Sequence, residues 1–364
     1  MKTKLFLTAS TAALCAFNVL SGNVRAAALA YGVTDLGTLG GSSSYGEGIN
    51  DSGQVAGQSR TTGDTTFHAV RWTGMLAEDL GTLGGEFSAG AGINASGQVA
   101  GLAGLTGSSA YHAVRWTGTL VEDLGTLGGT ISAGASINAS GQIAGQANIV
   151  GNTASHAVRW SGTTPTDLGT LGGENSYGNS INDSGQVAGY SQITGNSIDH
   201  AVRWTGTTPV DLGTLAGGNS RGSAINSSGQ VTGYSDMAAG AQHAVRWTGT
   251  TPTDLGTLGG SISHGLGIND FGDVVGFSLT TGDTTQVAFL YTEGTMYELS
   301  LLLLPGSGVT NLIVARGINN SGQIAATGII GGQQHALLLT PTPEPASALL
   351  LLGGAALLGL RRRR

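Results

Sequence analysis

The stretch INDSGQVAG, residues 49–57, decides how this sequence is to be interpreted, because versions of it occur seven times along the chain. The other copies begin at Ile93, Ile137, Ile181, Ile225, Ile268 and Ile318. Successive copies are separated by 44, 44, 44, 44, 43 and 50 residues. A repeat of this length is typical of β-propellers, in which four short strands form one blade. The spacing therefore predicts an all-β protein built from seven repeats.

Each repeat contains four segments that favour β-strands. In the first repeat, residues 44–50 favour a strand, a turn of the type Asn-x-Ser-Gly follows, and residues 54–59 favour a second strand. The motif HAVRW, residues 68–72, predicts a third strand, and DLGTL, residues 79–83, predicts a fourth. No segment between the two ends of the chain has helical periodicity. Each repeat is therefore expected to form an antiparallel meander of four strands.

One strand lies out of phase with the repeats. The copy DLGTLGG at residues 35–41 precedes the first set of inner strands, whereas the last set, residues 318–339, has no fourth strand after it. If the N-terminal strand completes the last sheet, a ring closes and no strand edge is exposed. We therefore predict that residues 31–341 form a seven-bladed β-propeller closed by its N-terminal strand. A solenoid with two shorter coils per repeat is the alternative, but it has no use for a displaced strand.

Both ends of the chain carry export features. Residues 1–30 combine two lysines, an apolar run and small residues, as secretory signal peptides do. Residues 342–364 combine a Pro-rich stretch, fifteen apolar or small residues and a basic end. The residues that define this tail are Pro343, Glu344, Pro345, Arg361, Arg362, Arg363 and Arg364. The apolar segment predicts a short transmembrane helix with its arginines on the cytoplasmic side. A permanent single-pass anchor is the alternative.

The part of the chain between these ends is acidic. Residues 31–342 contain eight arginines, no lysine and 21 acidic residues, which gives a formal charge of −13. Such a surface repels polyanions, which argues against nucleic acid as a partner. The single cysteine, Cys15, lies in the predicted signal peptide, so the mature chain has no disulfide. We identify no catalytic residue, and we expect neither a cofactor nor a metal.

Three residue types recur at fixed positions and are expected to be structural. Arg71 precedes Asp79 by eight residues, and a hairpin centred on residue 75 would place the two opposite each other as an ion pair. His68 has equivalents in five other repeats, which spread around a ring and cannot converge on one metal ion, so we predict hydrogen-bonded packing. Trp72 and its equivalents are expected to fill the core between sheets, with sugar stacking as the alternative.

Sequence variation is concentrated on one predicted face. In a meander, the first-to-second and third-to-fourth turns lie on one face, and these turns are nearly identical in most repeats. The second-to-third loops lie on the other face and differ, as in SRTTGDTTF, LAGLTGSSAY and QANIVGNTAS. Loops carry recognition while scaffolds repeat, so we expect the variable face to bind a partner, with neutral drift as the alternative. The polar candidates at the mouth of the central channel are Tyr45, Glu47, Tyr177, Asn179, Arg221, His264 and Arg316.

Two stretches resemble known families. The repeat, with G-I-N-x-x-G-Q-V-x-G followed by H-A-V and D-L-G-T-L-G-G, resembles the HAF family of extracellular repeats over nearly the whole mature chain. The tail PEPASALLLLGGAALLGLRRRR resembles the PEP-CTERM sorting signal. This second resemblance implies a Gram-negative bacterial protein that an exosortase cleaves near Pro343–Pro345 and that is released or attached at the envelope, often alongside exopolysaccharide. The HAF resemblance implies no catalysis.

Together these features favour an exported protein that binds a glycan or a protein partner in the cell envelope or extracellular matrix. Its expected processing partner is an exosortase-type enzyme, and its anchoring in the inner membrane is expected to be transient. One alternative is a secreted hydrolase or lyase that acts on polysaccharide with acids such as Glu47 at the channel mouth. An inert matrix component is a third possibility.

Overall fold

Strands and tight turns account for nearly all of the regular structure, as the repeat predicts. The computed structural model describes residues 29–342, so nearly all of the predicted signal peptide and sorting tail lie outside the described residues. Residues 32–340 form one unit, and residues 29–31 and 341–342 belong to a second, in which Thr342 N donates to Ala30 O over 2.9 Å. Within the described chain, no helix has the length and apolar character needed to cross a membrane.

Each repeat supplies four strands, which we group by their position in the meander. The first strands are β2 (Gly40–Ile49), β6 (Gly84–Ile93), β10 (Gly128–Ile137), β14 (Gly172–Ile181), β18 (Ser220–Ile225), β22 (Gly259–Ile268) and β26 (Val309–Ile318). The second strands are β3 (Val55–Thr61), β7 (Val99–Leu105), β11 (Ile143–Ile149), β15 (Val187–Ile193), β19 (Val231–Asp236), β23 (Val274–Thr280) and β27 (Ile324–Ile330).

The outer two positions follow the same order. The third strands are β4 (Phe67–Thr73), β8 (Tyr111–Thr117), β12 (Ser155–Ser161), β16 (Asp199–Thr205), β20 (Gln242–Thr248), β24 (Gln286–Thr292) and β28 (Gln333–Pro341). The fourth strands are β5 (Leu76–Asp79), β9 (Leu120–Asp123), β13 (Thr164–Asp167), β17 (Thr208–Asp211), β21 (Thr251–Gly256), β25 (Thr295–Glu298) and β1 (Tyr31–Asp35). Three short 3₁₀ helices lie between strands: η1 (Val150–Asn152), η2 (Ala238–Gly240) and η3 (Leu299–Leu302).

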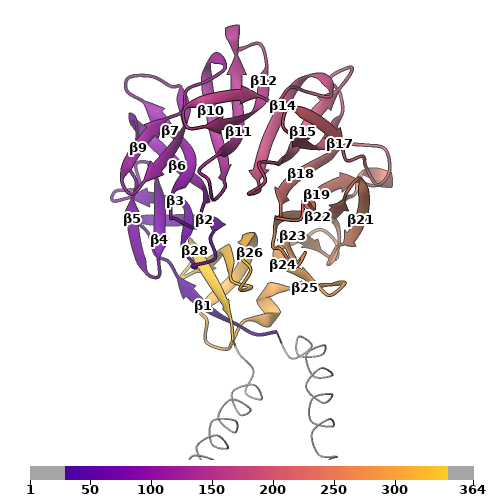
Figure 1. Ribbon diagram of the computed structural model, residues 1–364. Helices are drawn as coiled ribbons and strands as arrows, with labels where there is room; N and C mark the ends of the chain where they lie inside the picture. The colour runs from indigo at the N-terminus through magenta and orange to yellow at the C-terminus, as the bar shows by residue number, and fades with distance from the viewer. Residues whose placement is uncertain (1–28, 343–364) are drawn as a thin grey trace, which may run out of the picture. The chain divides into compact units, whose positions relative to one another are not determined.

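The described strands form five sheets of four strands and one sheet of eight, and neighbouring sheets follow one another around a centre (Figure 1). The eight-stranded sheet consists of two meanders, which a single parallel residue pair, Gln242 and Ile262, joins between β20 and β22. Because the link is this slight, we count β18–β21 and β22–β25 as two separate sheets below. Each first strand packs against the first strand of the next repeat, and β26 packs against β2. The predicted antiparallel meander is therefore confirmed in the first six repeats, and the last repeat supplies three antiparallel strands of its own.

The N-terminal strand completes the last sheet, as the displaced DLGTLGG copy predicts. The strand order of this sheet is β1-β28-β27-β26. Leu36 N donates to Ala336 O over 3.0 Å. Leu36 is buried among residues of this last sheet and of the β2–β5 sheet, and we call the junction between these two sheets the seam. Two segments about 300 residues apart in sequence are thereby held side by side. The outer edge of β28 is paired and is not left open to another chain.

A closed circle of asparagines explains the repeated Ile-Asn-x-x-Gly-Gln motif. In each repeat the Asn side chain is 3–5% exposed, and its Nδ2 donates to the main-chain carbonyl of the equivalent Asn in the next repeat. These seven contacts measure 2.9–3.5 Å, and the last, from Asn319 to Asn50 O, closes the circle. The Asn50 Oδ1 also accepts from Ser52 N and Gln54 N, which fixes the turn. The motif thus builds a turn and links the repeats.

The tryptophans form the core between sheets, as predicted. Trp72, Trp116, Trp160, Trp204 and Trp247 are completely buried. Trp116, on β8, packs against Ala56, Ala69 and Leu80 of the preceding sheet, and Trp72 packs in the same way against Ala325 and Ala336 across the seam. Burying a side chain of this size contributes roughly 2–3 kcal/mol. The alternative of sugar stacking is wrong for these residues, because no ring face reaches solvent.

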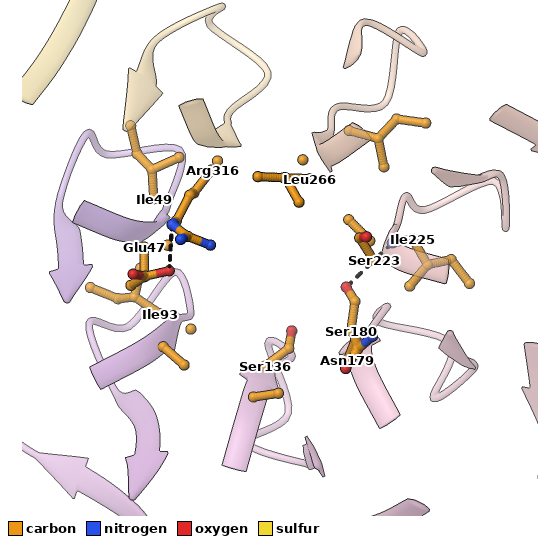
Figure 2. Close-up of a pocket in the computed structure, with 18 of the residues that line it drawn as sticks. Glu47, Ile49, Ile93, Ser136, Asn179, Ser180, Ser223, Ile225, Leu266 and Arg316 are labelled. Carbon is orange, nitrogen blue, oxygen red and sulfur yellow. Dashed lines mark hydrogen bonds and ion pairs between the residues drawn. The ribbon is translucent and has the colours of Figure 1, made fainter. Parts of the chain in front are cut away.

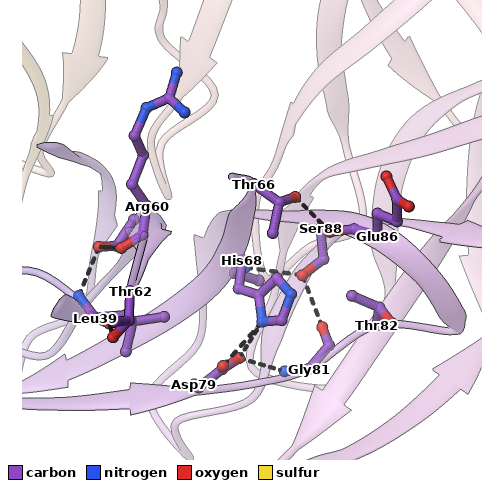
Figure 3. Close-up of polar contacts among 12 residues, drawn as sticks. Leu39, Arg60, Thr62, Thr66, His68, Asp79, Gly81, Thr82, Glu86 and Ser88 are labelled. Atoms are coloured by element: carbon purple, nitrogen blue, oxygen red, sulfur yellow. Dashed lines mark hydrogen bonds and ion pairs between the residues drawn. The ribbon is translucent and has the colours of Figure 1, made fainter. Parts of the chain in front are cut away.

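The histidines make the packed, hydrogen-bonded contacts that we expected, but their partner is an aspartate. His68 Nδ1 lies 2.9 Å from Asp79 Oδ2, and Asp79 Oδ1 also accepts from Gly81 N over 2.8 Å (Figure 3). The same His–Asp contact occurs in six sheets, including the last one, where His335 on β28 contacts Asp35 on β1. Each aspartate therefore ties the third strand to the turn after the fourth. Among residues 29–342, no group of three His, Cys, Asp or Glu side chains is placed to hold a metal.

The predicted ion pair between Arg71 and Asp79 is wrong by one residue. The hairpin pairs Thr73 with Leu76 and Arg71 with Glu78, so its loop has two residues and its centre lies half a residue earlier than predicted. Gly74, with φ +60°, supplies the conformation that such a short loop requires. Arg71 Nη2 lies 2.5 Å from Glu78 Oε2, and Arg115 makes the equivalent contact with Glu122. The position opposite the arginine is Thr166, Val210 and Thr253 in the next three repeats.

Candidate functional site

The first strands surround a central cavity of about 340 Å³ (Figure 2). Its lining includes the position of Glu47 in all seven repeats, occupied by Glu47, Ala91, Ala135, Asn179, Ser223, Leu266 and Arg316. A β-bulge falls at this position in each first strand; in β2, for example, the register with β3 shifts between Gly46 and Gly48. The three polar candidates at this level, Glu47, Asn179 and Arg316, all line the cavity.

Glu47 and Arg316 form the charged pair of the cavity and lie on the two sheets that meet at the seam. Arg316 Nε lies 3.2 Å from Glu47 Oε2, and the two side chains are 42% and 28% exposed. Burial raises the pKa of Glu47, and the charge of Arg316 opposes part of that rise. Of the residues that line this cavity in the described chain, Glu47 alone carries a carboxylate. Glycoside hydrolysis ordinarily uses two facing carboxylates, and the lining of this cavity in the described chain supplies one.

Asn179 has a structural contact at the same level. Its Nδ2 donates to Gly222 O of the next sheet over 2.7 Å. The other equivalents of Glu47 are the small or apolar residues Ala91, Ala135, Ser223 and Leu266. At this level of the cavity wall, the Glu47–Arg316 pair is therefore the only charged feature among the described residues.

The other four candidates lie two residues earlier on their strands, nearer the variable loops. Tyr177 on β14 stacks on Tyr190 of β15, with ring centroids 4.7 Å apart and planes at 23°. The guanidinium carbon of Arg221, on β18, lies 4.4 Å from the centroid of the same Tyr190 ring. Asp199 holds this guanidinium, because Arg221 Nε donates to Asp199 Oδ2 over 2.9 Å. Arg221 thereby bridges two sheets.

The stack continues across the next sheet. Arg221 is the cross-strand partner of Tyr234 on β19, and Tyr234 stacks on His264 of β22 with centroids 3.9 Å apart and planes at 8°. His264 in turn contacts Phe277 on β23, with centroids 4.8 Å apart. We name this continuous set the aromatic row: Tyr177, Tyr190, Arg221, Tyr234, His264 and Phe277. All six side chains are half-buried.

The aromatic row carries little net charge near neutral pH. Burial raises the pKa of Tyr190 to about 12 and also raises the pKa of Tyr234. Burial, followed by the nearby Arg221 charge, lowers the pKa of His264 to about 4, so its ring is neutral. His264 Nε2 lies 2.9 Å from Gln242 Oε1. Asp199 balances the charge of Arg221. A ligand would therefore meet hydroxyl groups and ring edges on the aromatic row, and no net charge.

The remaining candidate, Tyr45, belongs to a smaller cluster. Its ring lies 5.8 Å from that of Phe67, and the guanidinium carbon of Arg60 lies 4.5 Å from the Phe67 centroid. Tyr45 is therefore not part of the aromatic row. The seven candidates divide into three lining the cavity, three in the row and this one in a separate cluster.

Sequence reasoning missed half of the aromatic row. Tyr190, Tyr234 and Phe277 each follow the glycine of the repeated motif directly, where the two preceding repeats have Leu102 and Gln146. Three consecutive aromatic residues at one repeat position were a signal available in the sequence. The segment GNSRG at residues 218–222 also matches G-x-S-x-G, the motif that surrounds the nucleophilic serine of many hydrolases. Ser220 is fully buried there, and its Oγ is engaged by Ala201 N and Gly213 O at 2.9 and 2.8 Å, so it is structural.

Comparisons with known proteins give structural neighbours alone. No family model matches the chain, so its resemblances to the HAF repeats and the PEP-CTERM signal stay predictions. No curated protein matches it either. Among solved structures, TolB from Acinetobacter baumannii is 13% identical, with a TM-score of 0.42 over 68% of this chain and 64% of TolB. The WD40 β-propeller domain of Doa1 is 14% identical, with a TM-score of 0.45 over 86% of this chain and 98% of the domain. At this level of similarity neither neighbour indicates a function.

Proposed function

We propose that this protein is an exported seven-bladed β-propeller that binds a neutral polysaccharide along the aromatic row. The closed circle of seven asparagines and the completion of the last sheet by β1 support the blade count. The row lies at the variable-loop end of the first strands, where recognition is expected. The protein thus acts as a binding component of the cell envelope or extracellular matrix.

The proposal rests mainly on the three phenol hydroxyls of the aromatic row. Within the described chain, the hydroxyls of Tyr177, Tyr190 and Tyr234 make no hydrogen bond to another residue, and none of them is enclosed away from solvent. Their rings are held rigidly by stacking, so a ligand does not have to order them. A row of fixed hydroxyls beside ring edges matches a sugar chain, which presents hydroxyls and apolar C–H groups together.

A neutral ligand fits the charge around the row. The guanidinium of Arg221 is already paired with Asp199, and the part of the chain between the two ends has a formal charge of −13. An acidic polysaccharide would be repelled by this excess of negative charge. A protein partner is the other outcome that the binding test must detect.

A binding assay with a matched control tests the proposal. The protein is screened by affinity electrophoresis against neutral and acidic polysaccharides, and the double substitution Tyr190→Ala with Tyr234→Ala is compared with Leu102→Ala. Leu102 occupies the same repeat position on β7, outside the row. We expect the double variant to bind about tenfold or more weakly, from the loss of two aromatic contacts. Unchanged binding by the double variant, or capture of proteins but no polysaccharide in a pull-down from an envelope fraction, would contradict the proposal.

Export is a separate part of the proposal and rests on the two ends of the sequence. We propose that an exosortase-type enzyme removes the tail near Pro343–Pro345 after the short apolar helix has held the chain in the inner membrane. The mass of the intact native protein decides this. A mature mass without the four terminal arginines agrees with processing, and a mass that includes Arg361–Arg364 would show a permanent anchor.

A further inference from the structure

In four sheets an Asp or Asn of the second-to-third loop folds back onto the first strand. Its side-chain oxygen accepts a hydrogen bond from a main-chain N–H near the start of that strand, at 2.6–2.8 Å. The donor and acceptor residues are Ser42 and Asp64, Thr130 and Asn152, Glu174 and Asn196, and Ser261 and Asp283. All four acceptors have φ of 56–60°, a conformation that Asn and Asp tolerate. The loop thereby closes over the first strand.

The sheet β6–β9 lacks this closure. Ser108 occupies the position of Asp64, and its hydroxyl accepts instead from Ala110 N over 3.0 Å. Gly104 stands where the four closed sheets have Arg60, Asn148, Gln192 and Leu279, so a second side chain is missing from the same place. The structure has a cavity of about 590 Å³ here, lined by Glu86, Phe87, Gly104, Ser108 and Tyr111 among others. The space that protein side chains fill in the four closed sheets is open in this one.

We propose that this cavity binds an N-acetylated sugar residue, whose acetamido oxygen takes the place of the missing Asn side chain at Glu86 N–H. The closed sheets show which group this position accepts. Asn152 and Asn196 place an amide oxygen 2.8 Å from the main-chain nitrogens of Thr130 and Glu174. An acetamido group presents the same carbonyl, and its methyl and sugar ring pack against apolar surface.

The walls of the cavity favour an amide over a carboxylate. Asp64 and Asp283 show that a carboxylate oxygen also fits the hydrogen bond. In the open sheet, however, the acidic residue Glu86 is part of the cavity lining, and like charges repel. Phe87, which is 37% exposed, and the half-buried Tyr111 provide the apolar surface. A neutral acetamido sugar satisfies all three features.

This site adds a second sugar position to the proposed polysaccharide binding and rests on that proposal for its biological context. It lies on a different sheet from the aromatic row, so the two can fail separately. Loss of binding on changing Tyr190 and Tyr234 tests the row, whereas the substitutions below leave the row untouched.

The experiment fills the cavity with the side chain that the other sheets use. Binding of N-acetylchitotetraose to the full protein is measured by calorimetry and compared with cellotetraose, a neutral oligosaccharide without acetamido groups. We expect cellotetraose to bind about tenfold or more weakly, because the Glu86 N–H then loses its acceptor. Ser108→Asn should weaken N-acetylchitotetraose binding by a similar factor, and Ser108→Ala, which leaves the cavity open, should retain it.

A second variant that fills the cavity is needed in case the loop of the Ser108→Asn variant does not fold back onto the first strand. Gly104→Gln introduces the side chain found at Gln192, and a Cβ at residue 104 would meet its closest neighbour, Phe87 O, at 3.3 Å. Thermal melting confirms that each variant is folded before binding is compared. Equal affinity for the two oligosaccharides, or full binding by both filling variants, would overturn the proposal.

Discussion

The two ends of the first strands differ sharply in how much the repeats agree. At one end, seven buried asparagines make the same hydrogen bond in every repeat and form a closed circle. At the other end, the same strands carry the aromatic row on three sheets, whereas the equivalent pairs on two others are Ala89 with Leu102 and Ala133 with Gln146. One end must be uniform because each repeat supports the next, and the other is free to differ once the ring is closed.

The comparison shows that a uniform feature and a variable feature lie a few residues apart along the chain. Between Tyr177 and Asn182 lie four residues, yet the first belongs to a feature of three sheets and the second to a feature of all seven. The missing loop closure in the β6–β9 sheet is another local departure from the repeat. Departures from an otherwise regular repeat therefore indicate where to look for binding in this protein.

The largest expected effect comes from removing the strand that completes the last sheet. Deleting residues 31–40 removes β1, which is the fourth strand of the last sheet, and leaves the edge of β28 open. We expect aggregation or a large drop in melting temperature, because an exposed strand edge pairs with other chains. Gel filtration and scanning calorimetry measure both outcomes. A monomer with an unchanged melt would show that the ring does not depend on this strand.

The asparagine circle is tested by a pair of changes within one sheet. Asn138→Ala leaves Asn182 O and Gln142 N without their partner, and we expect the free energy of unfolding to fall by about 2–4 kcal/mol. Asn148→Ala is the control at the variable end, where Asn148 makes one long contact of 3.4 Å with Asn152, and should cost well under 1 kcal/mol. Urea unfolding measures both. Equal losses would contradict the distinction between the two ends.

The aromatic row should make stability sensitive to acid through His264. The folded protein keeps this ring neutral down to about pH 4, whereas the unfolded chain takes up a proton near the ordinary value of 6.5. Between these limits acidification favours the unfolded state, so His264 lowers stability by at most about 3 kcal/mol as the pH falls from 6.5 to 4. His264→Phe should lose this dependence, and Tyr177→Phe should keep it. If the melting temperatures of the wild type and of His264→Phe change by the same amount across this pH range, the prediction is refuted.

The smallest effect concerns a difference among the repeats themselves. Arg71 is paired with Glu78, whereas the buried Nε atoms of Arg159, Arg203 and Arg246 have no hydrogen-bond partner among the described residues. Glu78→Ala should cost about 0.5 kcal/mol, as expected for a partly exposed pair. Thr166→Glu, opposite Arg159, should stabilise the protein by a similar amount in urea unfolding at low salt. If Thr166→Glu destabilises the protein, an acidic residue placed opposite Arg159 is not sufficient to form the ion pair.

Much of the fold could be predicted from the repeat. The 44-residue spacing predicted four strands per unit, and the displaced DLGTLGG predicted that the N-terminal strand joins the last sheet, as β1 does. The hairpin register could not be obtained in this way, because a loop of two residues and one of three fit the same letters. The error assigned Asp79 to Arg71 in place of its true partner Glu78 and so left His68 without its aspartate.

The sequence by itself determined the number of repeats, the order of their strands and the positions that vary, because these depend on local turn chemistry and periodicity. The tertiary structure decided which of those positions act together. Tyr190 and Arg221 lie 31 residues apart in sequence, and Asn319 and Asn50 lie 269 residues apart, yet each pair is in contact. Contacts between sheets depend on how the ring closes and on which side chains meet across strands. The aromatic row depends on contacts between neighbouring sheets, and the cavity of the β6–β9 sheet depends on how its loop folds against its first strand.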